Sequence, residues 1–171
     1  MFFLSINGPS CSGKSTIIRE VMKVEKNLFY LSYDFLKWSF SGYNSKTHYD
    51  LVFDLLLDIA KISFEKKYNI ISDSSLYKKD RNKLIDLAKK YNYKIIEINL
   101  ETDFSVLEKR FAERVASALA NPNSRISNTS KERFKELASI FEKEKNSQAI
   151  VLRTDNQKIE EVVEEVLKLI K

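Results

Sequence analysis

The chain has 171 residues, of which 43% are hydrophobic and 31% charged, as is typical of one globular domain with a substantial core. Its single cysteine excludes an internal disulfide framework, and no apolar run is long enough to cross a membrane. We therefore expect no membrane partner and, with no signal peptide before the first strand, a cytoplasmic protein. The formal net charge of +5 is compatible with a polyanionic substrate, although a solvated lysine-rich surface is the commoner explanation.

An apolar run over residues 2–6 predicts the first strand, and residues 14–23 predict an amphipathic helix. The segment between them matches the phosphate-binding pattern G-x-x-x-x-G-K-S/T, the P-loop. Its glycines allow a close approach that side chains would block, and its amides at the positive end of a helix attract phosphate. The residues that we expect to bind the cofactor ATP here are Gly8, Ser10, Cys11, Ser12, Gly13, Lys14, Ser15 and Thr16. The alternative is a glycine turn beside a helix cap.

Residues 28–33 predict a second strand that ends at Asp34. Because ligands of open α/β sheets bind beyond the carboxyl ends of the strands, we expect Asp34 on the P-loop side. Two roles stay open for it: a cap for the following helix, or a catalytic residue that also contacts the acceptor. Lys37 and Trp38 follow, and aromatic rings beside a cation suit the stacking of a base or another flat acceptor. They equally suit core filling.

A long helix over about residues 49–67 is predicted next, followed by a third strand over residues 68–73. This strand ends in Asp73, which resembles a Walker B carboxylate. We expect Asp73 to face the acceptor and to hold Mg²⁺ together with the Ser15 hydroxyl. Motor ATPases usually place a glutamate at the next position, where this chain has Ser74. The pattern therefore favours phosphorylation of an acceptor over ATP hydrolysis that drives motion.

A helix over residues 80–91 and a fourth strand over residues 93–100 lead to a helix from Thr102 or Asp103 to about Leu119. Arg110 and Arg114 lie four residues apart and therefore share one face of that helix, close to its apolar stripe. Guanidinium groups pair with phosphate bidentately, so we expect both arginines to contact the donor phosphates. The alternative is a pair of ion-paired surface arginines.

Residues 120–129 form the longest polar, turn-rich interval and carry Arg125. We expect a small lid over about residues 115–130 that closes over the triphosphate with Arg125, or alternatively a plain linker. A fifth strand is predicted over residues 148–153, with a last helix after it. Arg153 ends that strand, at the sheet edge where P-loop proteins commonly seat adenine, so we count it among the ATP-binding residues.

Strands alternate with helices along the whole chain, which predicts a doubly wound sheet. We expect an α/β fold of the P-loop NTPase type: a three-layer sandwich with a five-stranded, mostly parallel sheet, helices on both faces and a small lid. The whole of residues 1–171 is predicted to be a single domain.

Four segments together resemble the kinase domain of the polynucleotide kinase of T-even phages and the wider P-loop kinase group that includes chloramphenicol phosphotransferase. They are the P-loop, Asp34 with a basic residue three positions on, residues 70–76 and residues 108–114. The resemblance implies that Asp34 acts as general base on the acceptor hydroxyl and that Arg114 contacts the donor phosphates. Where the family has an arginine this chain has Lys37, and a lysine does not reproduce bidentate phosphate recognition.

The function that we expect is an ATP- and Mg²⁺-dependent kinase with Lys14, Asp34 and Arg114 as catalytic residues. The preferred acceptor is the 5′-hydroxyl of a nucleic acid, bound through Asp34, Lys37, Trp38 and Asp73. A small-molecule hydroxyl, in a metabolite, nucleoside or antibiotic, is the alternative acceptor. A non-catalytic nucleotide-binding regulator is the third interpretation, and the sequence leaves the oligomeric state open.

Overall fold

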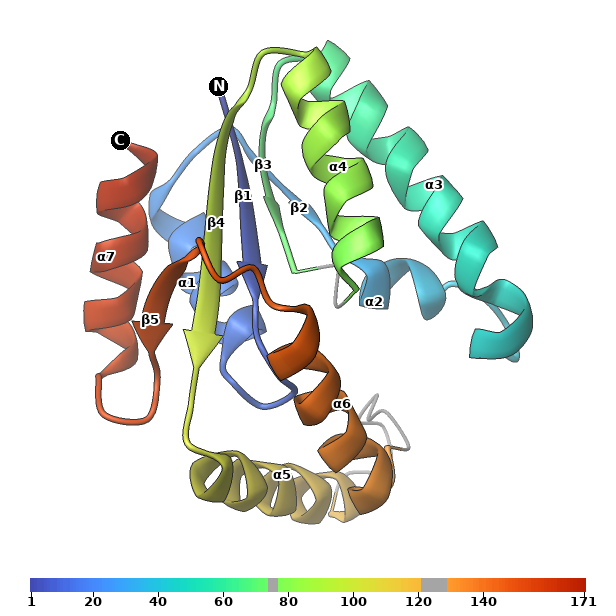
Figure 1. The fold of residues 1–171 in the computed structure, drawn as a ribbon, viewed down its shortest axis with the longest axis vertical. Coiled ribbons are helices and arrows are strands. Elements are labelled where there is room, and N and C mark those ends of the chain that lie inside the picture. Colours follow the sequence, from blue (N-terminus) through green and yellow to red (C-terminus); the bar gives the residue numbers. More distant parts are fainter. Residues whose placement is uncertain (74–76, 121–128) are drawn as a thin grey trace.

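A computed structural model of the chain describes residues 1–73, 77–120 and 129–171. At its centre lies a five-stranded sheet with the strand order β2-β3-β1-β4-β5 (Figure 1). The strands are β1 (Phe2–Asn7), β2 (Leu28–Leu31), β3 (Asn69–Ser72), β4 (Lys94–Glu101) and β5 (Ile150–Arg153). Every neighbouring pair is parallel, so all five carboxyl ends meet at one edge of the sheet. The predicted five-stranded sheet is confirmed.

Two pairs of helices cover the two faces of this sheet (Figure 1). Helices α1 (Lys14–Val24) and α7 (Ile159–Ile170) pack on one face, and α3 (Ser45–Glu65) and α4 (Lys78–Lys90) pack on the other. Successive residues of β1 alternate between the two cores: Phe2 and Leu4 belong to the first, Phe3 to the second. A strand buried on both sides reads as a continuous apolar run, which is why the sequence pattern predicts the three layers correctly.

Three further helices lie beyond the carboxyl ends of the strands: α2 (Tyr33–Lys37), α5 (Phe104–Leu119) and α6 (Lys131–Glu144). Ser130 caps α6, because its hydroxyl accepts a hydrogen bond from the Arg133 amide at 3.1 Å.

Most of the predicted lid cannot be compared with the structure. Residues 121–128, which include Arg125, lie outside the described residues.

The second strand is shorter than the sequence predicts. Its pairing with β3 ends at Leu31 opposite Ser72, and the chain then turns through the extended Ser32 into α2. Asp34 is therefore in the first turn of a short helix, instead of ending a strand. A strand extends only as far as the neighbouring strand pairs with it, and the β-rich composition of residues 28–33 does not predict where that pairing ends.

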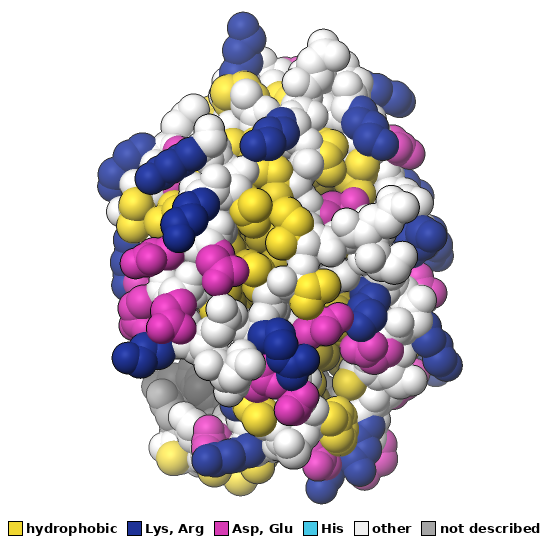
Figure 2. All heavy atoms as spheres, turned by 60° about the vertical axis from the view of Figure 1, so that its left-hand side comes forward, with side chains coloured by type: hydrophobic (Ala, Val, Ile, Leu, Met, Phe, Trp, Pro, Cys, Tyr) yellow, Lys and Arg dark blue, Asp and Glu magenta, His cyan; other side chains and the backbone are white. Residues whose placement is uncertain are grey.

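The edge of the sheet formed by β5 is partly apolar. Ile150 and Val151 are exposed there by 40% and 49%. Figure 2 brings the α7 and β5 side of the molecule forward and shows hydrophobic side chains gathered in the middle of this face, with charged side chains around them. No helix in the described part of the chain is both long enough and apolar enough to cross a membrane.

Candidate active site

The P-loop connects β1 to α1, and its backbone has the shape that phosphate binding requires. Gly13 has a φ of 96°, and a Cβ at Gly8 would lie only 2.6 Å from the Ser12 Oγ and 3.1 Å from the Leu100 carbonyl oxygen. Neither position therefore accepts a side chain without a shift of the loop. The Gly13 carbonyl accepts the Ile17 amide at 3.0 Å, so α1 starts directly from the loop and its first amides face the same side.

Lys14 bends back over this loop. Its Nζ donates hydrogen bonds to the carbonyl oxygens of Gly8 at 2.7 Å and Pro9 at 2.8 Å. Burial lowers the pKa of the Lys14 ammonium, while the charges of Asp73 and Asp34 oppose that shift. Lys14 is therefore within electrostatic reach of both carboxylates that the sequence singles out.

Asp73 follows β3 and receives a hydrogen bond at 2.7 Å on its Oδ2 from the Tyr30 hydroxyl of β2. Burial raises the pKa of the Asp73 carboxyl, and the Tyr30 hydrogen bond and the Lys14 charge oppose that rise. The Ser32 hydroxyl is buried beside them. The neighbourhood of Asp73 thus offers hydroxyl and carboxylate oxygens.

These oxygens suit Mg²⁺, which prefers hard oxygen ligands and is usually held by one or two protein groups plus substrate phosphates. The described residues contain no cluster of three His, Cys, Asp or Glu side chains that could hold a metal without such phosphates. Ser15 and Asp73 therefore fit the magnesium ion of a Mg·ATP complex better than a resident metal.

Asp34 lies on the exposed face of α2 and forms an ion pair with Lys37 at 2.6 Å. The Lys37 ammonium also lies 5.2 Å from the centroid of the Trp38 ring. Ser32, and not Asp34, occupies the N-cap position of α2, so a capping role for Asp34 receives no support. The three residues form one compact group on what we call the acceptor side, the side where the sequence analysis expects the acceptor to bind.

Next to this group lies a cluster of tyrosines drawn from three parts of the chain. The hydroxyls of Tyr33 and Tyr43 are 2.8 Å apart, and the rings of Tyr33 and Tyr49 are 5.3 Å apart. Tyr77 meets the Tyr49 ring edge-on at 6.3 Å, while the Tyr49 hydroxyl donates to the buried carboxylate of Asp80 at 2.5 Å. The rings are thus fixed against one another instead of filling the core singly.

One cavity of about 1360 Å³ joins the P-loop to this acceptor side. The predicted site residues that line it are Gly8, Ser10, Cys11, Ser12, Gly13, Lys14, Ser15, Thr16, Asp34, Lys37, Trp38, Asp73, Arg110 and Arg114. Residues that the sequence did not single out as site residues also line it, above all Tyr33, Tyr49, Tyr77, Lys46 and Lys79. No spacing in the sequence predicts that these residues lie together, because they come from three different helices or helix starts that meet only in the folded chain.

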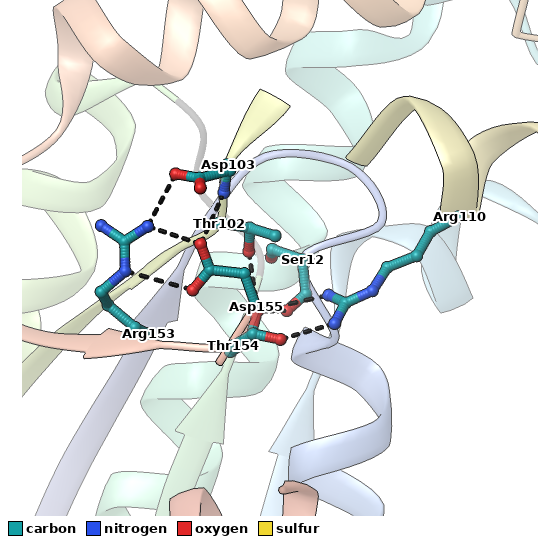
Figure 3. A network of polar contacts seen from close by, with 7 residues as sticks. All are labelled: Ser12, Thr102, Asp103, Arg110, Arg153, Thr154 and Asp155. Atoms are coloured by element: carbon teal, nitrogen blue, oxygen red, sulfur yellow. Dashed lines mark hydrogen bonds and ion pairs between the residues drawn. The ribbon is translucent and has the colours of Figure 1, made fainter. Parts of the chain in front are cut away.

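Arg110 is held by protein groups on the donor side of the cavity (Figure 3). Its guanidinium donates to the carbonyl oxygens of Thr154 at 2.5 Å and Cys11 at 3.4 Å. The buried Thr154 hydroxyl in turn donates to the Ser12 carbonyl at 2.9 Å and lies 2.7 Å from the Thr102 hydroxyl. Arg110 and Thr154 therefore tie the P-loop to the segment after β5. The role of Arg110 as a phosphate ligand stays a prediction.

Arg153 lies on the other side of this network (Figure 3). Its guanidinium pairs with the carboxylates of Asp103 and Asp155, and it does not line the cavity. The Arg153 hydrogen bond holds the pKa of the Asp155 carboxyl well below its usual range. The structure thus places Arg153 in an ion-pair cluster at the β4–α5 and β5–α7 junctions, outside the cavity that the P-loop lines. The sequence analysis expected it among the ATP-binding residues.

The fold and the loop between β1 and α1 define a P-loop protein. A family model described as an AAA domain matches residues 4–143, and the chain belongs to this family. Among curated proteins, none matches the chain.

Solved structures share the fold at low sequence identity. A provisionally assigned kinase from Chloroflexus aurantiacus superposes with a TM-score of 0.72 at 16% identity, over 99% of this chain and 95% of that one. The APS kinase CysC of Mycobacterium tuberculosis, in complex with AMPPNP and APS, gives 0.67 at 15%, over 99% and 96%. A chain of the Pnkp1/Rnl/Hen1 RNA repair complex gives 0.67 at 16%, over 83% of this chain and 44% of that one. The expected three-layer α/β fold of the P-loop NTPase type is confirmed, and the lid stays a prediction.

Proposed function

We propose that this chain is an ATP-dependent kinase that transfers the γ-phosphate to an acceptor hydroxyl. One observation carries the proposal: a single cavity is lined both by the P-loop with Lys14 and by the exposed carboxylate of Asp34. A phosphate cradle and a proton acceptor in one cavity are the two parts that phosphoryl transfer to an alcohol needs. The charges of Asp34 and Asp73 both act on Lys14, which supports a short path between donor and acceptor.

In the proposed reaction, Lys14, Arg114 and the loop amides stabilise the negative charge of the β- and γ-phosphates. Mg²⁺, when bound through Ser15 and Asp73, supplies further positive charge to the same oxygens. Asp34 orients the acceptor hydroxyl and takes its proton as the new P–O bond forms and the bond to ADP breaks. Catalysis is then mainly positioning and electrostatics.

The preferred acceptor is the 5′-hydroxyl of a polynucleotide. The cavity is lined by eight lysines and arginines against three aspartates, a surplus of five positive charges. Two of these cations, Lys46 and Lys79, form no ion pair with any described residue. Clustered tyrosine rings beside cations that have no ion-pair partner in the described part of the chain suit the bases and phosphates of a single strand. The fold shared with a chain of an RNA repair complex is compatible with this acceptor.

A small-molecule hydroxyl is the second candidate acceptor. The chain aligns over nearly its full length with an APS kinase whose structure contains AMPPNP and APS, so a fold of this size accommodates a small acceptor. Further parts of the proposal are a single kinase domain over residues 1–171, a lid over about residues 115–130 and a cytoplasmic location.

Transfer of labelled γ-phosphate from Mg·ATP to a panel of acceptors tests this function. The panel contains 5′-hydroxyl RNA and DNA oligonucleotides, nucleosides and hydroxylated small molecules. We expect label on oligonucleotides and a loss of about 10²- to 10⁴-fold in Asp34→Asn, because a general base contributes that much. ATP affinity is expected to stay within about twofold of wild type, since Asp34 sits on the acceptor side.

Asp50→Asn is the matched control, because Asp50 is another exposed carboxylate that lines the same cavity. Full activity in Asp34→Asn contradicts the base assignment. Label only on a small molecule keeps the mechanism and replaces the acceptor. Tight ATP binding without label on any acceptor favours the non-catalytic regulator.

A further inference from the structure

Tyr30 is a side chain outside the predicted motifs that lies directly against the proposed Mg²⁺ ligands. It comes from β2 and pairs in register with Ile71 of β3, and its hydroxyl donates to the Oδ2 of Asp73, just after the end of β3, at 2.7 Å. Its ring meets Phe35 of α2 edge-on at a centroid distance of 5.1 Å, which fixes the ring from the acceptor side. The hydroxyl is therefore held in place by packing as well as by Asp73.

The hydroxyl of Tyr30 has one proton to give and lone pairs that accept. Its proton goes to Asp73, so its lone pairs face donors. The Ser15 and Ser32 hydroxyls lie beside it and lower the pKa of Tyr30. Asp73 and burial outweigh them and raise that pKa overall.

The Tyr30 hydroxyl donates its hydrogen bond to one carboxylate oxygen of Asp73, so the second carboxylate oxygen is left for the metal ion or its bound water. Groups that orient metal ligands in this way commonly change metal affinity about 10- to 100-fold when they are removed.

We infer that Tyr30 is a positioning residue for Mg·ATP, which sets the orientation of the Asp73 carboxylate. The inference rests on the proposed nucleotide chemistry of the same cavity, but it does not depend on which acceptor is used. Tyr30 touches neither phosphate nor acceptor in this role and acts through Asp73.

The test is the equilibrium affinity for ATP, measured by calorimetry with excess Mg²⁺ and again with EDTA, in wild type and in Tyr30→Phe. The substitution removes one oxygen and keeps the ring against Phe35. We expect the affinity for metal-free ATP to stay within about twofold, and the gain in affinity that Mg²⁺ provides to fall about tenfold. Asp73→Asn is expected to lose at least as much of this gain, because Asp73 is itself a proposed ligand of the metal ion. The double variant is expected to lose little more than Asp73→Asn, because Tyr30 acts through Asp73.

Tyr93→Phe is the matched control. Tyr93 is buried, and its hydroxyl donates to the Tyr68 carbonyl at 2.9 Å, near the amino ends of the strands and away from the cavity. The Tyr93→Phe variant should be less stable, but the gain in ATP affinity that Mg²⁺ provides should not change.

Two results overturn the inference: an unchanged gain in Tyr30→Phe, or an equal loss of affinity with and without the metal ion, which indicates a structural role alone. Failure of the proposed function has a different signature, because it leaves these binding constants intact while no acceptor receives label.

Discussion

The two ends of the cavity are built in different ways. At the donor end, backbone carbonyls of the P-loop are bonded to Lys14, Arg110 and Thr154, and the Thr154 hydrogen bond is buried. At the acceptor end, Asp34 and Trp38 are exposed. Asp34 belongs to α2, which is only five residues long and ends just before Trp38. The donor end is rigid because segments far apart in the sequence fix its backbone. The acceptor end depends on side chains, so its specificity can differ from that of other proteins with the same P-loop.

The largest effect that separates the two ends is expected from Lys14→Ala. It removes the cation that lies over the P-loop, so both ATP affinity and transfer should fall, the latter about 10³-fold. Asp34→Asn is expected to reduce transfer alone. Binding of ATP and single-turnover transfer, measured side by side, distinguish the two patterns.

Lys23→Ala provides the control for Lys14, since Lys23 lies on the same helix and pairs with Glu20 at 2.7 Å on the exposed surface. A Lys14→Ala variant that binds ATP normally and has reduced affinity only for the acceptor would place Lys14 at the wrong end of the cavity.

A smaller effect is expected from Thr154→Val, which keeps the volume of the side chain and removes its hydroxyl. The Ser12 carbonyl then has no partner for a buried hydrogen bond, at a cost of about 1–3 kcal/mol in the free energy of unfolding. The P-loop is held less firmly, so the KM for ATP should rise about threefold to tenfold, while the KM for the acceptor stays unchanged.

Thr102→Val sharpens this prediction, because the Thr102 hydroxyl lies 2.7 Å from that of Thr154 and is not bonded to the P-loop. It should lower stability with little change in the KM for ATP. Equal changes in the KM values of ATP and acceptor would show that Thr154 supports the whole cavity and not the donor end.

The same contrast explains how far the sequence predicts the structure. The donor end is encoded locally: Gly8, Gly13 and Lys14 are close in sequence, and their spacing alone predicts the loop, the helix and the phosphate chemistry. The apolar runs of the sequence likewise predict the strands that are buried on both faces. Tyr33, Tyr49 and Tyr77 give no such signal, since their rings meet only after α3 and α4 have packed.

Two individual residues show where sequence reasoning ends. Arg153 stands where an adenine contact is plausible, but the nearby carboxylates of Asp103 and Asp155 take its guanidinium. Tyr30 looks like an ordinary strand residue, and only the parallel register of β2 and β3 brings its hydroxyl to Asp73. In both cases, a partner that decides the role is more than forty positions away in the chain.

The smallest expected effect concerns the acceptor end and its surplus charge. In Lys46→Gln and Lys79→Gln, each substitution removes one cation from the cavity lining. For an oligonucleotide acceptor, the slope of log affinity against log salt should decrease by about 0.7 for each phosphate that is no longer neutralised, because fewer counterions are released. ATP affinity should not change.

Lys61→Gln is the control for these two variants, as Lys61 is an exposed lysine on α3, like Lys46, but does not line the cavity. A slope that is the same in all three variants and in wild type would mean that these lysines meet no phosphate. The acceptor would then be sought among small hydroxylated molecules, which have no charged backbone and can bind against the tyrosine cluster.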